Sequence, residues 1–202
     1  MTGLLQSGET KILVTGATGF IGRHLCENLL GNGFFVRVLI RGYNPTLLKS
    51  NPNLEKYFGD LLDPVFLAKA CEGVDVIVHL AALAHTISST QEQLHEINVH
   101  GTELLLAAAT EQKVRRFVFM SSSLASIGNT QDFPATAYGR AKLAAEKLVM
   151  SNRKAGSMKC VILRPVNVYG PGMRGNLGLL ISLIFKRLVL PLPRLKTSLS
   201  LV

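Results

Sequence analysis

A glycine-rich segment between a short apolar run and an amphipathic pattern constrains the fold of this chain most. The run Lys11–Thr15 has the length and composition of a buried strand, and Ile21, Leu25 and Leu29 then recur every four residues, as in a helix. Residues 15–22 (TGATGFIG) join the two. A tight turn from a strand into a helix brings free backbone N–H groups and the positive end of the helix dipole together. A diphosphate binds well at such a point.

Each glycine of this segment has its own predicted task. Gly16 permits the sharp turn out of the strand, Gly19 lets backbone amides approach a diphosphate, and Gly22 lets the helix pack closely on the sheet. The predicted binding loop is completed by Thr18, Phe20 and Ile21. An ordinary glycine-rich turn is the alternative, but the strand before the loop and the helix after it favour a dinucleotide site.

Strands and helices alternate along most of the chain. Further strands are predicted at Phe34–Ile40, Glu55–Gly59, Val74–His79, Arg116–Ser121 and Lys159–Leu163. Helices are predicted at Asp63–Glu72, Gln91–Gln112 and Ala137–Arg153. Because this alternation requires crossover connections, we expect an α/β fold with a doubly wound, mostly parallel sheet of the Rossmann type, covered by helices on both faces.

The pattern changes after Arg164. Residues 165–176 are rich in Gly, Pro and Asn, which is typical of a loop, and an apolar helix is predicted over Leu177–Leu188. We therefore predict an NAD(P)-binding domain over residues 1–165 and the start of a substrate-binding domain, incomplete at its C-terminus, over residues 166–202. The apolar face of Leu177–Leu188 would lack its cover, so we expect it to pair with another subunit in a homodimer or to cause aggregation.

Composition limits the location and the partners of the chain. Hydrophobic residues make up 48% and charged residues 17%, which is a globular composition. The first ten residues lack the features of a secretory signal, and the apolar stretch Leu177–Phe185 is too short to cross a membrane. Cys26, Cys71 and Cys160 have no metal-like spacing, so we expect reduced core thiols, no metal site and a cytoplasmic location.

The net charge of +9 is spread along the chain. It could serve a nucleic acid, an acidic membrane surface or a phosphorylated ligand, but a solvated basic surface is the simpler interpretation. With 6% aromatic residues and no basic stripe interleaved with aromatics, the sequence argues against nucleic-acid binding.

Two residues at predicted strand ends bear on the choice of dinucleotide. Rossmann sites often carry an acid at the end of the second strand that binds the ribose 2′-OH, but this chain has Leu39-Ile40-Arg41. Arg41 can face a 2′-phosphate, which favours NADP over NAD; a surface arginine or one stacked on adenine is the alternative. Asp60 is predicted to accept a hydrogen bond from the adenine amino group, and a helix-capping aspartate is the alternative.

Tyr138 and Lys142 form a candidate acid–base pair. They lie four residues apart on a predicted helix and therefore on one face of it. A free tyrosine has a pKa of about 10, and a neighbouring ammonium lowers that pKa by favouring the phenolate. The run 121–123, three serines, ends the fifth strand, at the sheet edge where ligands of open α/β sheets bind. A hydroxyl there can hold a substrate oxygen beside the tyrosine, although a serine run after a strand is otherwise a polar turn.

Taken together, these residues resemble the extended short-chain dehydrogenase/reductase family of nucleotide-sugar epimerases, dehydratases and reductases. The resemblance spans about residues 11–202. It rests on the glycine loop, Asp60-Leu61, His79-Leu80-Ala81-Ala82, the segment 98–102 (NVHGT), the serine run, the Tyr138/Lys142 pair and the segment 164–172 (RPVNVYGPG).

The resemblance implies a role for each matching position. Ser123, with Ser122 as second choice, would bind the sugar oxygen, Tyr138 would be the catalytic acid/base, and Lys142 would tune its pKa. The cofactor would be bound by the glycine loop and by Arg41, Asp60, Leu61, Leu80, Ala81, Ala82, Tyr138, Lys142 and Pro165. Asn167 and Asn176 would face the sugar nucleotide, and Asn98 would brace the backbone near the active site.

We therefore expect an NAD- or NADP-dependent enzyme that moves a hydride to or from a nucleotide sugar, UDP-linked by resemblance. Within the family the chain is most similar to bacterial UDP-N-acetyl-sugar 4-epimerases and hexulose reductases. Ser123-Leu124-Ala125 argues against dehydration, because related 4,6-dehydratases carry Thr with an adjacent Asp-Glu pair. Reduction and epimerisation share their chemistry and are not separated by the sequence. The alternative is a truncated chain that binds a dinucleotide without turnover, in a binding or scaffold role.

Overall fold

The fold is described from a computed structural model that covers residues 6–42, 48–83, 90–126, 136–155, 158–173 and 185. The chain divides into two compact units, Met1–Arg164 and Pro165–Val202. The helices and strands given below lie in the first unit. Most of the predicted helix Leu177–Leu188 lies outside the described residues, so its pairing with another subunit stays a prediction.

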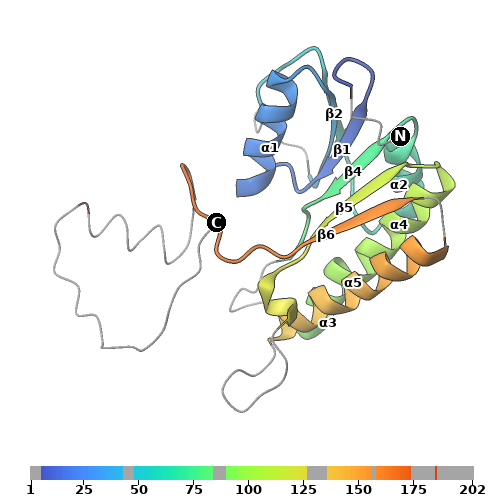
Figure 1. Cartoon of the computed structure of the whole chain (residues 1–202), viewed down its shortest axis with the longest axis vertical. Coiled ribbons are helices and arrows are strands. Elements are labelled where there is room, and N and C mark those ends of the chain that lie inside the picture. Colours follow the sequence, from blue (N-terminus) through green and yellow to red (C-terminus); the bar gives the residue numbers. More distant parts are fainter. Residues whose placement is uncertain are drawn as a thin grey trace. The chain divides into compact units, whose positions relative to one another are not determined.

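The first unit is built on a six-stranded parallel sheet of order β3-β2-β1-β4-β5-β6 (Figure 1). The strands are β1 (Lys11–Thr15), β2 (Phe35–Ile40), β3 (Leu54–Phe58), β4 (Val76–His79), β5 (Arg116–Met120) and β6 (Lys159–Leu163). Every neighbouring pair is parallel. The order reverses between β1 and β4, which is the switch point where dinucleotides bind in such sheets.

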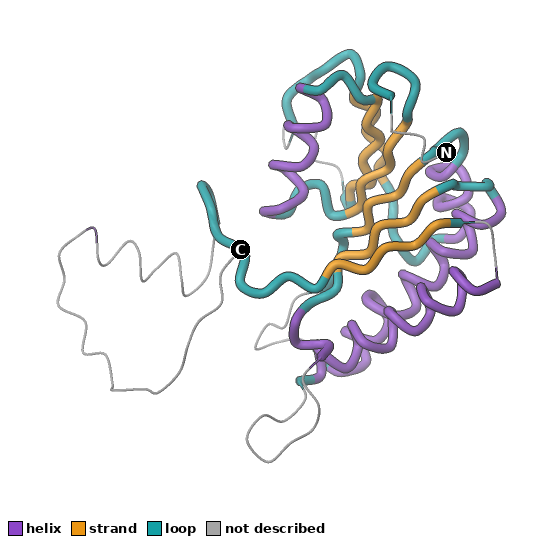
Figure 2. Tube along the Cα trace, in the orientation of Figure 1, coloured by secondary structure: helices purple, strands orange, loops and turns teal. Residues whose placement is uncertain are grey.

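Helices cover both faces of the sheet, as expected for a doubly wound fold (Figure 2). They are α1 (Phe20–Gly31), α2 (Pro64–Cys71), α3 (Gln91–His95), a π-helical segment (Glu96–His100), α4 (Gly101–Glu111), a 3-10 turn (Ser123–Ser126) and α5 (Ala137–Ala155). Alternation along β1 explains the two layers: Ile12 and Val14 pack toward α1, whereas Leu13 packs in the cluster that includes residues of α2, α4 and α5.

The predicted helix Gln91–Gln112 is not one regular α-helix. Residues Glu96–His100 form a π-helical segment between α3 and α4. The side chain of Asn98 on this segment exchanges two hydrogen bonds with the backbone of Leu83, at 2.7 and 2.9 Å. The apolar periodicity continues through the segment, so the sequence pattern does not reveal the extra residue in the turn. Such segments are frequent at functional sites.

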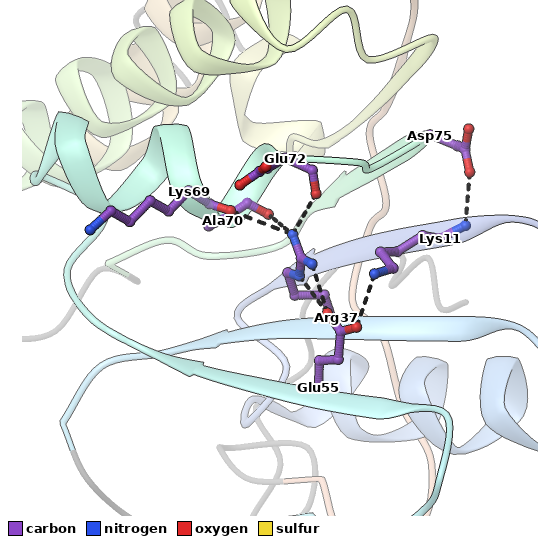
Figure 3. A network of polar contacts seen from close by, with 7 residues as sticks. All are labelled: Lys11, Arg37, Glu55, Lys69, Ala70, Glu72 and Asp75. Atoms are coloured by element: carbon purple, nitrogen blue, oxygen red, sulfur yellow. Dashed lines mark hydrogen bonds and ion pairs between the residues drawn. The ribbon is translucent and has the colours of Figure 1, made fainter.

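A buried arginine joins β2, β3 and the end of α2 (Figure 3). Arg37 is 5% exposed, and it donates to the carbonyl oxygens of Ala70 and Glu72 at 2.9 and 2.8 Å. Its guanidinium also pairs with Glu55, which receives a second ion pair from Lys11. Because carbonyls at a helix C-terminus have no partner within the helix, this guanidinium satisfies the end of α2 from inside the sheet.

Candidate functional site

The loop after β1 has the conformation that the glycine pattern predicts. Gly16 has φ +70°, and a Cβ built there would lie 2.7 Å from the backbone nitrogen of Ala81. Gly19 donates to the carbonyl of Gly16 at 3.0 Å and caps α1. A Cβ on Gly22 would collide with the carbonyl oxygen of Gly16, so Gly22 lets the helix pack on the loop itself rather than mainly on the sheet.

The loop and the start of α1 fit a dinucleotide diphosphate. The remaining predicted loop residues, Thr18, Phe20 and Ile21, form the end of the loop and the first turn of α1. The first N–H groups of a helix have no partner within it, and the helix dipole favours an anion there. Arg23 follows Gly22, and its buried Nε has no hydrogen-bond partner among the described residues. A Cβ on Gly16 would collide with the backbone of Leu80 and Ala81 beside this loop.

A pocket at the carboxyl edge of the sheet brings together residues that are far apart in the sequence. Six of the predicted cofactor residues line it: Gly16, Arg41, Asp60, Leu61, Ala81 and Ala82. The other four lining residues had not been predicted to contact the cofactor: Leu39, Leu62, Leu83 and Ile97. Leu80 differs from its neighbours, because it packs against the core on the α1 side. This pocket has the apolar wall and the few polar groups that suit an adenosine.

Asp60 and Arg41 are the charged residues of this pocket. Asp60 Oδ1 accepts a hydrogen bond from the backbone of Leu62 at 2.9 Å. The helix-capping alternative for Asp60 is wrong, because Asp63 caps α2 by accepting from Val65 and Phe66. Arg41 directly follows β2 and is exposed at the pocket wall. Its guanidinium can therefore meet a ligand in this pocket.

A directed chain of hydrogen bonds runs through Thr15, His79 and Thr102 under the site, and no role had been predicted for these three side chains. Thr102 Oγ1 donates to the carbonyl of Asn98 at 2.8 Å, so it accepts from Nε2 of His79, 3.0 Å away. Thr15 Oγ1 accepts from the backbone of Ala81 at 3.1 Å and donates to His79 Nδ1 at 2.6 Å. His79 is therefore neutral, and burial lowers its pKa to about 3, with the charge of Lys142 adding to the effect.

This chain ties the loop after β1 to the cofactor wall after β4. Thr15 immediately precedes Gly16, and Ala81 lines the pocket. Asn98 holds Leu83 on the same wall, which agrees with the bracing role that the resemblance implies. His79 and Thr102 each lie in a segment that carries the family resemblance, but only the fold shows that their side chains form a hydrogen bond.

Tyr138 and Lys142 lie on one face of α5, as their spacing predicts. Lys142 is 2% exposed, and its Nζ donates to the carbonyl of Met120 at 2.8 Å. The same Nζ lies 4.8 Å from the ring centroid of Phe119 and 5.9 Å from that of Tyr138. Burial lowers the pKa of Lys142 to about 8, although the carboxylate of Glu146 acts in the opposite direction.

The predicted lowering of the tyrosine pKa is not seen in this structure. Burial raises the pKa of Tyr138 above its ordinary value. The ammonium of Lys142 is engaged by the carbonyl of Met120 instead of by the phenol. In this state Tyr138 is protonated at neutral pH, so the phenol is a proton donor.

The three serines after β5 have different surroundings. Ser121 is buried, and its hydroxyl donates to Glu146 at 2.5 Å. Ser122 accepts from the backbone of Leu124 at 3.2 Å, and Ser123 begins the 3-10 turn. Ser122 and Ser123, the two predicted substrate-binding serines, are half-buried.

The other predicted site residues belong to the second unit. Pro165 and Asn167 are described there, and Asn176 lies outside the described residues. Their roles toward the cofactor and the sugar stay predictions. In the described part of the chain, no group of three or more His, Cys, Asp or Glu residues could hold a metal ion. None of the described helices has the length and apolar character of a membrane span.

Residues 12–193 match the model of a protein family described as the NAD dependent epimerase/dehydratase family. The chain belongs to this family. The family is NAD-dependent, and solved structures similar to this chain contain bound NAD.

The names of similar proteins point to different substrates. The chain is 33% identical over 179 residues to 3 beta-hydroxysteroid dehydrogenase/Delta 5-->4-isomerase of Mycobacterium tuberculosis, and the match covers 80% of this chain and 48% of that protein. It is 32% identical over 196 residues to UDP-glucose 4-epimerase of Vibrio cholerae, and that match covers 90% of this chain and 58% of the epimerase. The solved structure of UDP-glucuronic acid 4-epimerase from Bacillus cereus with NAD matches with a TM-score of 0.76 and 31% identity, covering 89% and 64%. The chain thus spans about half the length of the curated relatives it matches.

Proposed function

We propose that this chain contributes the cofactor and acid–base half of an enzyme that oxidises or epimerises a UDP-linked sugar. The observation that carries the proposal is the position of Tyr138 and Lys142. They lie on one face of α5, beside the carboxyl edge where the glycine loop and the pocket also lie. The similarity to two sugar-nucleotide epimerases supports the choice of substrate.

Different residues would bind the diphosphate and the adenosine of the cofactor. The loop from Gly16 to Gly22 and the start of α1 would receive the diphosphate, and the pocket bounded by Asp60 and Ala81 would receive the adenosine. When bound, NAD supplies the acceptor and later the donor of a hydride. We propose that Arg41 also accommodates the 2′-phosphate of NADP, since no acid occupies the end of β2.

Tyr138 would move the proton that accompanies the hydride. The Lys142 ammonium and the positive charge of the bound cofactor would first favour the phenolate form of Tyr138, with the phenol proton released to solvent. As the carbinol C–H of the sugar passes its hydride to the cofactor, the sugar hydroxyl would give its proton to the phenolate oxygen of Tyr138 and the C=O bond would form. Returning the hydride to the same face reverses this step, and returning it to the opposite face produces the epimer. Ser123 would hold the sugar oxygen, and the ammonium of Lys142 would stabilise the phenolate.

The hydroxysteroid dehydrogenase relative favours a second candidate substrate, a 3β-hydroxysteroid. A 3β-hydroxysteroid also carries a secondary alcohol, so the same proton and hydride transfers apply.

Free, buried cysteines in the described residues suit a reducing compartment, and we propose a cytoplasmic location.

The test is turnover by the purified chain. We would supply NAD⁺ or NADP⁺ with UDP-glucose, UDP-glucuronic acid or a 3β-hydroxysteroid, and follow reduced cofactor by absorbance and sugar epimers by NMR. Tyr138→Phe is the matched control, because it keeps the ring and removes the hydroxyl. We expect sugar turnover that Tyr138→Phe abolishes. Turnover of the steroid but of neither sugar would mean that the substrate is a steroid and not a UDP-linked sugar. Cofactor binding without turnover of any substrate would support a non-catalytic binding role.

A further inference from the structure

A buried acid lies directly behind the candidate acid–base pair. Glu146 follows Lys142 by four residues on α5 and is 4% exposed, so Tyr138, Lys142 and Glu146 share one face of the helix. Acidic residues are almost never this buried unless they are paired. The chemistry proposed above gives Glu146 no task.

Both carboxylate oxygens of Glu146 are engaged. Arg164 holds them with two bonds, from Nε to Oε1 at 2.8 Å and from Nη2 to Oε2 at 2.5 Å. Ser121 adds a third bond, to Oε1. Burial alone would raise the pKa of Glu146, but the hydrogen bonds from Arg164 and Ser121 and the charges of Arg164 and Lys142 outweigh it and lower the pKa. Glu146 is thus a carboxylate at neutral pH.

These contacts fix the segment that carries the candidate catalytic serine at both of its ends. At one end Ser121 is bound by Glu146, and at the other Ser126 accepts from Nη1 of Arg164 at 2.9 Å. Ser122 and Ser123 lie between the two anchors. Gly139 permits the close packing of α5 on this segment, because a Cβ there would lie 2.5 Å from the carbonyl oxygen of Leu124.

The same contacts also fix the acceptor of the lysine. Ser121 follows Met120, whose carbonyl accepts the hydrogen bond from Lys142 Nζ. The path from Lys142 through Met120, Ser121 and Glu146 returns to Lys142 along α5. The carboxylate of Glu146 therefore acts on Lys142 in two ways. It holds the backbone whose carbonyl binds the lysine, and its charge favours the protonated lysine.

The charged and titratable groups near Lys142 come from three elements. Tyr138 and Glu146 lie on α5 with it, neutral His79 ends β4, and Arg164 follows β6 and reaches the lysine only through Glu146. From β5 the lysine meets an uncharged carbonyl and the ring of Phe119. Among these groups Glu146 is the one anion that favours a charged lysine.

We propose that Glu146, clamped by Arg164, is a positioning residue that keeps Lys142 charged and in register with the Ser122–Ser123 segment. This inference rests on the proposed function for its catalytic meaning, but its physical content can be measured without any substrate. Removing the charge of Glu146 removes the anion that opposes the effect of burial on Lys142. The ammonium then loses its proton at a lower pH.

The first experiment follows the titration of Lys142 by NMR of protein labelled with ¹³C at lysine Cε. The Lys142 signal is assigned by its loss in Lys142→Met. We expect Glu146→Gln, which keeps the volume of the side chain, to move the Lys142 midpoint to lower pH. Glu103→Gln is the matched control, since Glu103 is an exposed acid on α4, and it should leave the midpoint unchanged. An unchanged midpoint in folded Glu146→Gln would overturn the proposal.

A second variant keeps the test decisive where Glu146→Gln does not fold. Ser121→Ala retains both charges of the clamp but releases the Met120–Ser121 end, so we expect an altered Lys142 signal with a nearly unchanged midpoint. A Ser121→Ala signal identical to wild type would contradict the positioning role.

Turnover separates this inference from the proposed function. With an active wild type, Glu146→Gln should lower kcat about tenfold, shift the alkaline limb of the pH profile to lower pH, and leave cofactor Kd nearly unchanged. A wild type without turnover would refute the proposed function and leave the lysine titration as the measure of the clamp.

Discussion

Protonation of His79 should make the fold sensitive to mild acid. The imidazole is fully buried, and both of its nitrogens are used by Thr15 and Thr102. Its folded pKa of about 3 lies below the ordinary value of 6.5. As the pH falls below 6.5 the unfolded chain binds a proton that the folded chain refuses, so the free energy of unfolding decreases until the pH reaches the folded pKa.

The size of this effect follows from the two pKa values. One proton bound only by the unfolded state costs about 1.4 kcal/mol for each pH unit, so the fold should lose about 2 kcal/mol between neutral pH and about pH 5. Glu55 and Glu146 also have shifted pKa values, but theirs lie below the ordinary 4.5, so their contributions are lost at lower pH. The window between about pH 6.5 and 5 therefore reports mainly on His79.

The assay is urea unfolding followed by circular dichroism at about pH 7 and about pH 5, on wild type and on His79→Gln. The variant starts less stable, but the drop of about 2 kcal/mol should be missing from it. Equal losses of stability in the two proteins would refute the reasoning. NMR of the wild-type imidazole gives an independent check, because a ring that titrates near pH 6.5 would contradict the buried, neutral histidine.

Three further perturbations have clear expected outcomes. Gly16→Ala should abolish NADH binding, measured by nicotinamide fluorescence, because the new Cβ meets the backbone of Ala81; Gly73→Ala, which has a similar φ of +66° but no neighbour within 4 Å, should bind normally. Thr102→Val should lower the free energy of unfolding by about 3 kcal/mol, since it leaves the His79 ring and the Asn98 carbonyl without their buried partner. Thr102→Ser keeps the hydroxyl and should cost about 1 kcal/mol. Equal urea denaturation midpoints for the two variants would refute this. Burial raises the pKa of Cys26 and Cys71 to about 12, so a thiol reagent at mildly alkaline pH should modify these two only after urea is added; their modification in the native protein would contradict the packing.

The sequence predicted the parts of the fold that depend on local patterns. β1 and β6 have the predicted bounds, because each is a short apolar run bounded by turns. The glycine loop was also predictable, since a positive φ at Gly16 and close approach at Gly22 are properties that only glycine supplies. The parallel pairing of neighbouring strands was predictable too, because strands that alternate with helices are joined by crossover connections.

The parts that were not predicted depend on contacts between distant residues. Glu146 and Arg164 are separated by 18 positions, and nothing in the apolar pattern of α5 or β6 marks them as partners. The hydrogen-bond chain through His79 joins residues from β1, β4 and α4, so its direction appears only once Thr102 is seen to donate to Asn98. The protonated state of Tyr138 was also missed, because burial depends on the packing around α5 rather than on the spacing from Lys142.

The most direct test of the account is a titration of the purified chain with NADH and NADPH, followed by nicotinamide fluorescence. We predict saturable binding by wild type and loss of binding in Gly16→Ala. In Arg41→Ala we predict that the affinity for NADPH falls more than the affinity for NADH, each compared with wild type. A folded wild-type chain that binds neither dinucleotide would contradict the account of the glycine loop and the pocket.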